Sequence, residues 1–165
     1  MNDDINTVSM LVRREIEALI TVPLLKAFTE AIGKEKTFAI AETVIGQLAR
    51  DSGKMLAELA GGSRLADLET ILPLFSQDGA LAIDLPESGP ERILMNVSRC
   101  AYAEMYKRNG MAEFGYLLSC GRDYALFEGF NPDIRFTRTQ TIMEGADYCD
   151  FCLSSAENKT TGTGL

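Results

Sequence analysis

The sequence contains no histidine and no tryptophan among its 165 residues. The absence of histidine excludes a Ser-His-Asp triad, a Cys-His pair and any histidine-ligated metal site. A general base must therefore be Asp, Glu, Tyr, Lys, a thiolate or a metal-bound water. We expect any chemistry in this chain to rest on carboxylates and thiols.

Clusters of positive charge are also missing. The chain has 16 Lys and Arg against 24 Asp and Glu, a formal net charge of −8. Because phosphate neutralisation requires grouped Lys and Arg, we expect neither nucleic acid nor an anionic membrane surface as a partner. No apolar run approaches the roughly 20 residues of a membrane-spanning helix. The acidic start, MNDDINTVSM, lacks the pattern of a secretory signal, so the expected location is the cytoplasm.

The first 75 residues predict helices. Apolar residues recur at helical spacing over residues 4–32, where Pro23 is expected to break or kink the helix. Two further helices are predicted over residues 36–60 and 63–75. The second helix has a row of apolar residues expected to face the core: Phe38, Ile40, Val44, Ile45, Leu48, Met55, Leu56 and Leu59.

The remaining sequence alternates between strand and helix patterns. Strands are predicted over residues 80–85, 91–97, 134–143 and 148–153, and helices over residues 99–109 and 112–127. Two strand hairpins separated by two helices, after an N-terminal set of helices, predict an α+β fold with an antiparallel sheet of about four strands. We predict one domain over residues 1–153 and a disordered polar tail over residues 154–165.

The helix predicted over residues 112–127 has the most informative pattern. One face carries aromatic and reactive groups together: Tyr116, Cys120, Asp123, Tyr124 and Phe127. A carboxylate on such a face is costly to bury without a partner. Asp123 is therefore either a base or metal ligand beside Cys120, or the partner of an arginine such as Arg122 or Arg135.

The cysteines are Cys100, Cys120, Cys149 and Cys152. A structural disulfide is not expected in a reducing cytosol, and burial as small apolar side chains is the alternative to reactivity. Cys149 and Cys152 form a C-x-x-C pair, but on a strand they point to opposite faces, so we discount zinc and redox chemistry there. Cys100 lies at the start of the helix predicted over residues 99–109, where exposed N–H groups can acidify a thiol.

The segment FTRTQTIME is expected to be a strand that contains Arg138 and Thr139. An arginine in such a strand could clamp a substrate carboxylate through two parallel hydrogen bonds. The alternative is a solvated residue at the edge of the sheet.

Residues 99–151 share several features with a known family. These are a cysteine before a short helix (Cys100), a helix bearing Cys120 and then Asp123, an Arg-Thr strand, and a Gly-x-x-x-Cys-Asp-Phe ending that contains Cys149. In these features the chain resembles the L-2-amino-thiazoline-4-carboxylic acid hydrolase family. The last third of the chain carries the resemblance closely, and the helical first half matches only in general character.

The resemblance implies hydrolytic opening of a 2-amino-thiazoline carboxylate to an N-carbamoyl cysteine, a small-molecule reaction. The implied catalytic residues are Cys100, Cys120, Asp123 and Cys149, and the implied substrate-binding residues are Arg138, Tyr116 and Thr139. Two routes are open. Either Cys120 attacks as a thiolate with Asp123 as base, or Cys100, Cys120 and Cys149 hold a divalent metal ion with Asp123 as fourth ligand or base. Cys152 lies outside the pattern.

The ending EGADYCDF is also similar to that of the ligand-binding domains called 4-vinyl reductase domains. This second resemblance implies a non-enzymatic module that binds or senses a small molecule. Such a module is expected to bind without turnover and to form a homodimer through its N-terminal helices.

Overall fold

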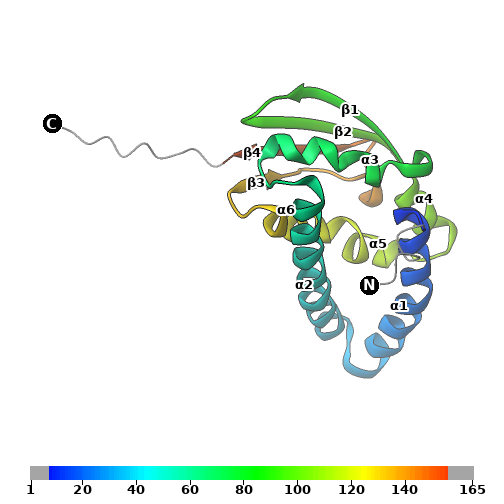
Figure 1. The fold of residues 1–165 in the computed structure, drawn as a ribbon. Coiled ribbons are helices and arrows are strands. Elements are labelled where there is room, and N and C mark those ends of the chain that lie inside the picture. Colours follow the sequence, from blue (N-terminus) through cyan, green and yellow to red (C-terminus); the bar gives the residue numbers. More distant parts are fainter. Residues whose placement is uncertain (1–7, 156–165) are drawn as a thin grey trace.

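The computed structural model describes residues 8–155 (Figure 1). The α-helices are α1 (Met10–Ile32), α2 (Lys34–Ala60), α3 (Leu72–Phe75), α4 (Ala101–Arg108), α5 (Ala112–Leu118) and α6 (Asp123–Phe130). Short 3-10 helices are η2 (Leu65–Thr70), η3 (Gln77–Gly79), η4 (Cys120–Arg122) and η5 (Ile142–Glu144). The strands are β1 (Leu81–Ser88), β2 (Arg92–Cys100), β3 (Ile134–Thr137) and β4 (Cys149–Ser155).

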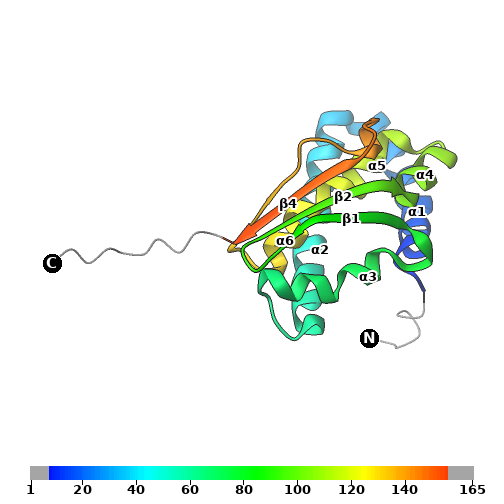
Figure 2. The ribbon, with the colours of Figure 1, turned by 90° about the horizontal axis from the view of Figure 1, so that it is seen from above.

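The four strands form one antiparallel sheet in the order β1-β2-β4-β3. The helices α2, α5 and α6 lie together on one side of this sheet (Figures 1 and 2). The predicted α+β class is therefore confirmed, with N-terminal helices and with further helices between the hairpins. No helix within residues 8–155 is long and apolar enough to cross a membrane.

The strand boundaries differ from the predicted ones for local reasons. β1 continues through Pro86, which the edge position of the strand and a shift in its pairing register allow. β3 ends at Thr137, because the Asp150 side chain accepts hydrogen bonds from the backbone N–H groups of Thr139 and Gln140. β4 extends to Ser155, two residues into the predicted tail, and the rest of that tail lies outside the described residues.

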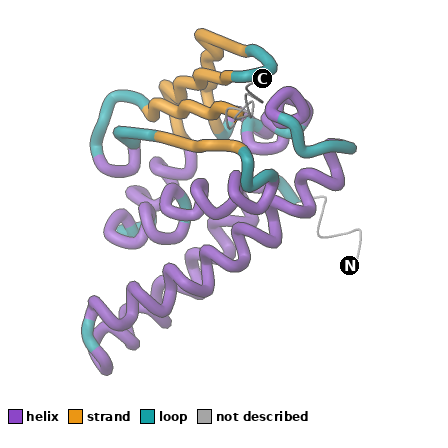
Figure 3. Tube along the Cα trace, turned by 90° about the vertical axis from the view of Figure 1, so that its left-hand side faces the viewer, coloured by secondary structure: helices purple, strands orange, loops and turns teal. Residues whose placement is uncertain are grey.

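The two long helices form a hairpin that extends away from the sheet (Figure 3). Pro23 was predicted to break or kink the first helix, and it does not break it, since α1 continues through this residue. The predicted inward row on α2 is also wrong for five of its members, which are 53% to 67% exposed: Ile40, Val44, Leu48, Met55 and Leu59.

Small residues explain why the large side chains of α2 point outward. The buried residues of α2 are Thr37, Ala41, Ala49 and Gly53. A Cβ atom on Gly53 would lie 2.1 Å from the Leu126 carbonyl oxygen in α6. The α2 and α6 backbones thus approach closely, and the face of α2 that packs on the protein is the one with the smallest side chains.

The buried apolar side chains form two clusters. One joins the sheet to α6 and the second half of α2, and it contains Phe127, Phe136 and Leu153. The other joins α1, α4 and α5, and it contains Val22, Met105 and Phe114. Cys100 and Cys120 pack against the second cluster, whereas Phe151 packs against the first. The side chains that could take part in chemistry therefore lie where the two clusters meet.

Candidate functional site

A cavity of about 110 Å³ lies at this meeting point. Its chemically active lining residues are Cys100, Cys120, Cys149, Asp123, Arg138 and Tyr102. Apolar side chains that include Phe75, Val97 and Phe151 complete the wall. Five of the seven residues predicted for the site, from four separate parts of the chain, thus surround one small space.

Cys100 and Cys149 occupy ends of neighbouring strands. Cys100 ends β2 and caps α4, with its sulfur 3.4 Å from the Ala103 backbone nitrogen that donates to it. Cys149 begins β4 and accepts a hydrogen bond from the Ile142 backbone N–H at 3.2 Å. Because β2 and β4 pair antiparallel, the end of one lies beside the start of the other.

Cys120 and Asp123 lie at a break in the helix that was predicted to be continuous over residues 112–127. α5 ends at Leu118, Cys120 begins the single 3-10 turn η4, and Asp123 begins α6. The prediction of one uninterrupted face is therefore wrong. The break places both Cys120 and Asp123 in the cavity wall, while Tyr116 on α5 lines a different cavity.

Arg138 holds Asp123 in place. Its Nη1 donates to Asp123 Oδ2 at 2.5 Å, and its Nη2 donates to the Cys120 carbonyl oxygen at 3.1 Å. Only 2% of the Arg138 side chain is exposed, against 28% for Asp123. The guanidinium also lies 5.3 to 5.9 Å from the centroids of four aromatic rings: Tyr116, Tyr124, Phe136 and Phe151. Arg138 is thus enclosed and committed to orienting the Asp123 carboxylate.

Arg122 and Arg135 were the candidates if Asp123 had an arginine partner, and the structure shows Arg138 in that role. From the sequence, Arg138 was considered only as a clamp for a substrate carboxylate or as a solvated residue at the sheet edge. In the structure the chain has already left β3 at Thr137, which frees Arg138 to turn toward α6.

The titration behaviour of the site follows from burial. Burial raises the pKa of Asp123 from 3.8 to about 6, even though Arg138, Arg122 and Arg14 oppose the shift. Burial, and then the negative charge of Asp123, raises the pKa of the Cys120 thiol. Burial also raises the pKa of Cys100 and Cys149. The thiols are therefore neutral near pH 7, whereas the carboxyl group changes charge close to it.

The three thiols do not form a metal site with Asp123. Within residues 8–155, no group of three or more Cys, Asp or Glu side chains is arranged so that it could hold a metal ion. Two of the sulfurs instead accept backbone hydrogen bonds, from Ala103 and Ile142. The ligand set that the metal route requires is thus not provided by these residues.

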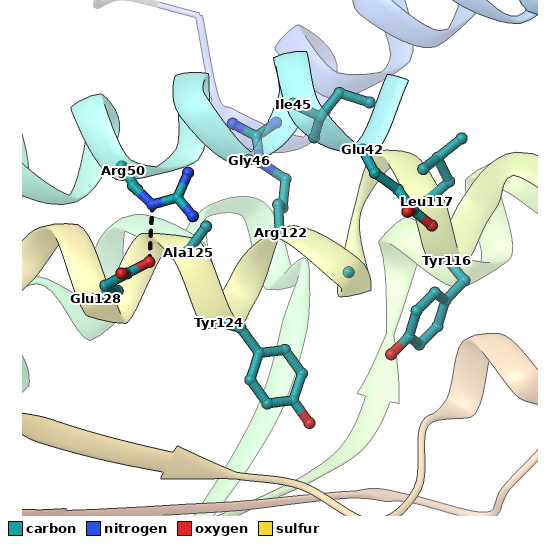
Figure 4. Close-up of a pocket in the computed structure, with 11 residues that line it drawn as sticks. Glu42, Ile45, Gly46, Arg50, Tyr116, Leu117, Arg122, Tyr124, Ala125 and Glu128 are labelled. Atoms are coloured by element: carbon teal, nitrogen blue, oxygen red, sulfur yellow. Dashed lines mark hydrogen bonds and ion pairs between the residues drawn. The ribbon is translucent and has the colours of Figure 1, made fainter. Parts of the chain in front are cut away.

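Three other residues considered in the sequence lie away from the Cys120–Asp123 cavity. Thr139 donates its hydroxyl to Asp150 at 2.6 Å and lines a separate pocket of about 340 Å³ with Cys152. Cys149 and Cys152 diverge as expected, since the first lines the Cys120–Asp123 cavity and the second lines this separate pocket. Tyr116 is 38% exposed and lines a separate cavity of about 460 Å³ between α2, α5 and α6 (Figure 4).

Two arginines in the cavity wall were not found from the sequence. Arg14 on α1 and Arg122 on η4 both line the space that holds Cys120 and Asp123. From the sequence, Arg122 was considered only as a partner for Asp123, and Arg14 was not singled out. A signal was present in the segment Cys-Gly-Arg-Asp, where an arginine lies between the two candidate catalytic residues.

Comparison with known proteins gives a matching family and solved structures of similar fold. The model of the family "L-2-amino-thiazoline-4-carboxylic acid hydrolase" matches residues 13–153. No curated protein matches the chain. The phenol-responsive sensory domain of the transcription activator PoxR, solved with phenol, is similar in structure with a TM-score of 0.52 and 9% identity, over 81% of this chain and 71% of that domain.

A second solved structure has a comparable likeness. It is trafficking protein particle complex subunit 3 from Naegleria fowleri, covalently bound to palmitic acid. Its TM-score is 0.54 at 10% identity, over 88% of this chain and 96% of that one. At such identities these likenesses establish a shared fold.

Proposed function

We propose, from the premise that the chain belongs to the L-2-amino-thiazoline-4-carboxylic acid hydrolase family, that it hydrolyses a small cyclic amidine carboxylate of the 2-amino-thiazoline type. In this proposal water adds to C2 of the ring, and Asp123 is the general base. The cavity has a volume of about 110 Å³, which is smaller than the roughly 300–1,000 Å³ of pockets for drug-sized molecules. It therefore favours a ligand of few atoms, such as a single substituted ring.

The observation that carries the proposal is the state of the Asp123 carboxyl group. Arg138 binds it through Oδ2, and Oδ1 accepts no hydrogen bond from the residues that the structure describes. One oxygen is thus fixed while the other is available to a water molecule in the cavity. A pKa of about 6 means that the carboxylate is mostly ionised at pH 7 yet basic enough to accept a proton.

The reaction balances without a further reactant. Asp123 takes one proton from the water molecule as the water oxygen bonds to C2, and Asp123 then gives this proton to the ring nitrogen. The tetrahedral adduct then breaks its C2–S bond, the electron pair goes to sulfur, and the carbonyl forms. Of the two protons of water, one ends on nitrogen and the other on the new thiol. The product is an N-carbamoyl cysteine.

A covalent route through Cys120 is the alternative mechanism for the same reaction. It requires the Cys120 proton to pass to Asp123 before the sulfur attacks C2. The raised pKa of the thiol, increased further by the Asp123 charge, opposes this transfer. We therefore favour direct attack by water, with Cys120 as a neutral thiol in the cavity wall.

The test is incubation of the purified chain with 2-amino-thiazoline-4-carboxylate, followed by mass spectrometry for a product that is heavier by one water and carries a free thiol. The variants are Cys120→Ser and Asp123→Asn, and Cys152→Ser is the matched control outside the cavity. Turnover lost in Asp123→Asn and kept in Cys120→Ser supports direct attack by water. A covalent adduct on Cys120 that disappears in Cys120→Ser supports the other route, and no turnover by the wild-type chain contradicts the proposal.

Ligand sensing without turnover is the second candidate function. The specific support is the fold likeness to the PoxR domain, which was solved with phenol, together with the aromatic and apolar part of the cavity wall. The palmitic acid bound to the trafficking protein particle complex subunit is a poorer guide to the ligand of this chain. A palmitoyl chain needs far more room than the cavity volume of about 110 Å³. Saturable binding of 2-amino-thiazoline-4-carboxylate without product formation would favour sensing.

We also propose that the chain forms a homodimer through the α1–α2 hairpin (residues 10–60). Twelve large apolar side chains on these two helices are between 44% and 67% exposed. Seven lie on α1 and five on α2: Val12, Ile16, Leu19, Ile20, Leu24, Phe28, Ile32, Ile40, Val44, Leu48, Met55 and Leu59. Together they offer on the order of 1,000 Å² of apolar surface, against the roughly 800 Å² that each partner buries in a standard interface.

The charge distribution favours a second copy as the occupant. Residues 10–60 contain seven Lys and Arg and seven Asp and Glu, so the hairpin has no net charge although the whole chain carries −8. A two-fold interface brings identical surfaces together, and the neutral hairpin is the region where this costs least in repulsion. Its i, i+4 rows of apolar side chains suit packing of helix ridges into grooves.

The assembly is tested by sedimentation velocity over a range of protein concentrations, with wild type and with Ile20→Lys/Val44→Lys. Leu85→Lys on β1 is the control, since it changes an exposed apolar residue outside the hairpin. We expect a dimer for wild type and Leu85→Lys, and a monomer for the double variant. A wild-type chain that stays monomeric, or that binds instead to neutral lipid vesicles, overturns the proposal.

A further inference from the structure

We infer that Arg14 and Arg122 form the anion-binding subsite of the cavity, which takes the carboxylate of the ligand. The inference rests on the proposed function for the identity of the ligand, although the subsite is argued from the side chains alone. It replaces Arg138, which the sequence suggested for this task and which the structure commits to Asp123.

The first step concerns burial. The Arg14 side chain is 13% exposed and that of Arg122 is 11% exposed. Both line the cavity with Cys120 and Asp123. Arg122 also lines the neighbouring cavity of about 460 Å³, and Figure 4 shows its side chain extending from there toward α2. Guanidinium groups this far inside a protein require a negative partner, because burying an unpaired charge is costly.

The second step is that the two arginines share one carboxylate. Glu17 on α1 forms an ion pair with Arg14, and its Oε2 is 4.0 Å from Nη1 of Arg122. Glu17 is itself 48% exposed, so it neutralises the pair only from the solvent side. Nε of Arg122 is buried and has no hydrogen-bond partner among the residues that the structure describes. A hydrogen-bond donor is thus left over.

The third step is the charge balance of the cavity. Three guanidinium groups, Arg14, Arg122 and Arg138, face two carboxyl groups, Glu17 and Asp123. Burial, and next the charge of Arg14, lowers the pKa of Arg122 to about 10, as expected for two cations forced together. A chain with a net charge of −8 therefore encloses a local excess of positive charge. A ligand carboxylate in the cavity would remove this excess through the guanidinium groups that line it.

The subsite is tested with ligands that cannot be hydrolysed. Thiazolidine-4-carboxylate and thiazolidine-4-carboxamide differ only in charge at the proposed contact, and neither contains the amidine that reacts. We expect calorimetric titration of the wild-type chain to show at least about tenfold tighter binding of the carboxylate, since hydrogen bonds between charged groups contribute about 1.5–3 kcal/mol. Arg14→Gln and Arg122→Gln should each reduce the preference for the carboxylate to less than about twofold, because the hydrogen bond between charged groups is lost.

Two further variants make the result decisive. Arg135→Gln changes an exposed arginine on β3 outside the cavity, so it should keep the full preference. Glu17→Gln removes the competing carboxylate, so it should tighten carboxylate binding, which gives a readout of opposite sign should Arg122→Gln fail to fold. Equal binding of both ligands by wild type, or an unchanged preference in both arginine variants, overturns the subsite.

The same titrations separate the subsite from the reaction. A preference for the carboxylate without turnover of 2-amino-thiazoline-4-carboxylate supports the subsite and contradicts the proposed hydrolysis. Turnover with equal binding of carboxylate and carboxamide contradicts the subsite and leaves the hydrolysis standing.

Discussion

Charged side chains are buried around the cavity, whereas large apolar side chains are exposed along the α1–α2 hairpin. Most proteins bury apolar groups and expose charges, so each region departs from the rule in the opposite direction. Both departures cost stability in the isolated chain, and a bound partner would relieve each of them. At the cavity that partner would be a small anion, and at the hairpin it would be a second protein surface. The contrast indicates that binding is distributed over two separate places in the molecule.

The largest effect is expected at the cavity, from Asp123→Asn. Loss of the general base should lower kcat by about 100-fold to 10,000-fold, the usual range for such a group. Dimer formation should not change, because Asp123 lies in the cavity wall and is not one of the exposed apolar residues of the hairpin. Steady-state kinetics with 2-amino-thiazoline-4-carboxylate, together with sedimentation, would show both. A variant that keeps wild-type kcat would remove Asp123 from the mechanism.

The next largest effect is expected on stability, at the contact between α2 of the hairpin and α6, the helix that begins with Asp123. Gly53→Ala would place a Cβ atom 2.1 Å from the Leu126 carbonyl oxygen, and so would force α2 and α6 apart. Overpacking of this kind typically costs about 1–3 kcal/mol, and backbone contact places it at the upper end. Urea unfolding measures the loss, and Gly46→Ala on the same helix is the control, because its Cβ would meet only the Arg50 side chain at 3.7 Å. Equal stability of the two variants would contradict the close helix contact.

The fold class could be predicted because the evidence for it is local. Turn residues separate the strands, and periodic apolar residues mark the helices, so the α+β class and the sheet of four strands follow from the sequence. The orientation of α2 did not follow. Its apolar row has the period of a core-facing helix, and only the position of Gly53 against α6 shows that the opposite face is the buried one.

Five residues that line the candidate site could be predicted from the sequence, but the contacts between them could not. Cys100, Cys120, Asp123, Arg138 and Cys149 were all named from the sequence, and they line one cavity. The Arg138–Asp123 pair depends on where β3 ends, which is set by Asp150 eleven residues beyond Thr139. Hydrogen bonds between residues this far apart in the chain produce no periodic pattern in the sequence. Arg14 was missed for the same reason, since its relation to Arg122 exists only after α1 has packed.

A smaller effect, on the affinity of the proposed dimer, is expected from reversing one surface charge of the hairpin without removing any apolar side chain. Glu30→Lys alters an exposed charge on α1 and leaves all twelve exposed apolar side chains in place. It ends the charge neutrality of residues 10–60, so it should weaken the dimer by about two- to fivefold at low salt, in line with exposed charges worth up to about 1 kcal/mol. Sedimentation at about 0.02 and 0.5 M salt should show this weakening only at the lower salt. A dimer affected equally at both would contradict an electrostatic origin.

The smallest effect is a one-proton dependence of stability on pH. It compares the Asp123 carboxyl group, whose pKa burial raises, with the Asp150 carboxyl group, whose pKa hydrogen bonds lower. Burial raises the pKa of Asp123 from 3.8 in the unfolded chain to about 6 in the folded protein. The folded protein therefore binds this proton more tightly. Its contribution to stability is complete below about pH 4 and is lost as the pH rises through about 6, with a slope of at most about 1.4 kcal/mol per pH unit.

Asp150 provides the matched control of opposite sign. Burial alone would raise its pKa, but hydrogen bonds from Thr139 and Gln140 outweigh burial and lower it. Its contribution is therefore present above the unfolded pKa and is lost as the pH falls. Urea unfolding between pH 3 and 8 should show that the stability of wild type relative to Asp123→Asn decreases with rising pH, whereas relative to Asp150→Asn it increases. The same sign for both would mean that the Arg138 ion pair, and not burial, controls Asp123, and that the carboxylate is too weak a base for the proposed reaction.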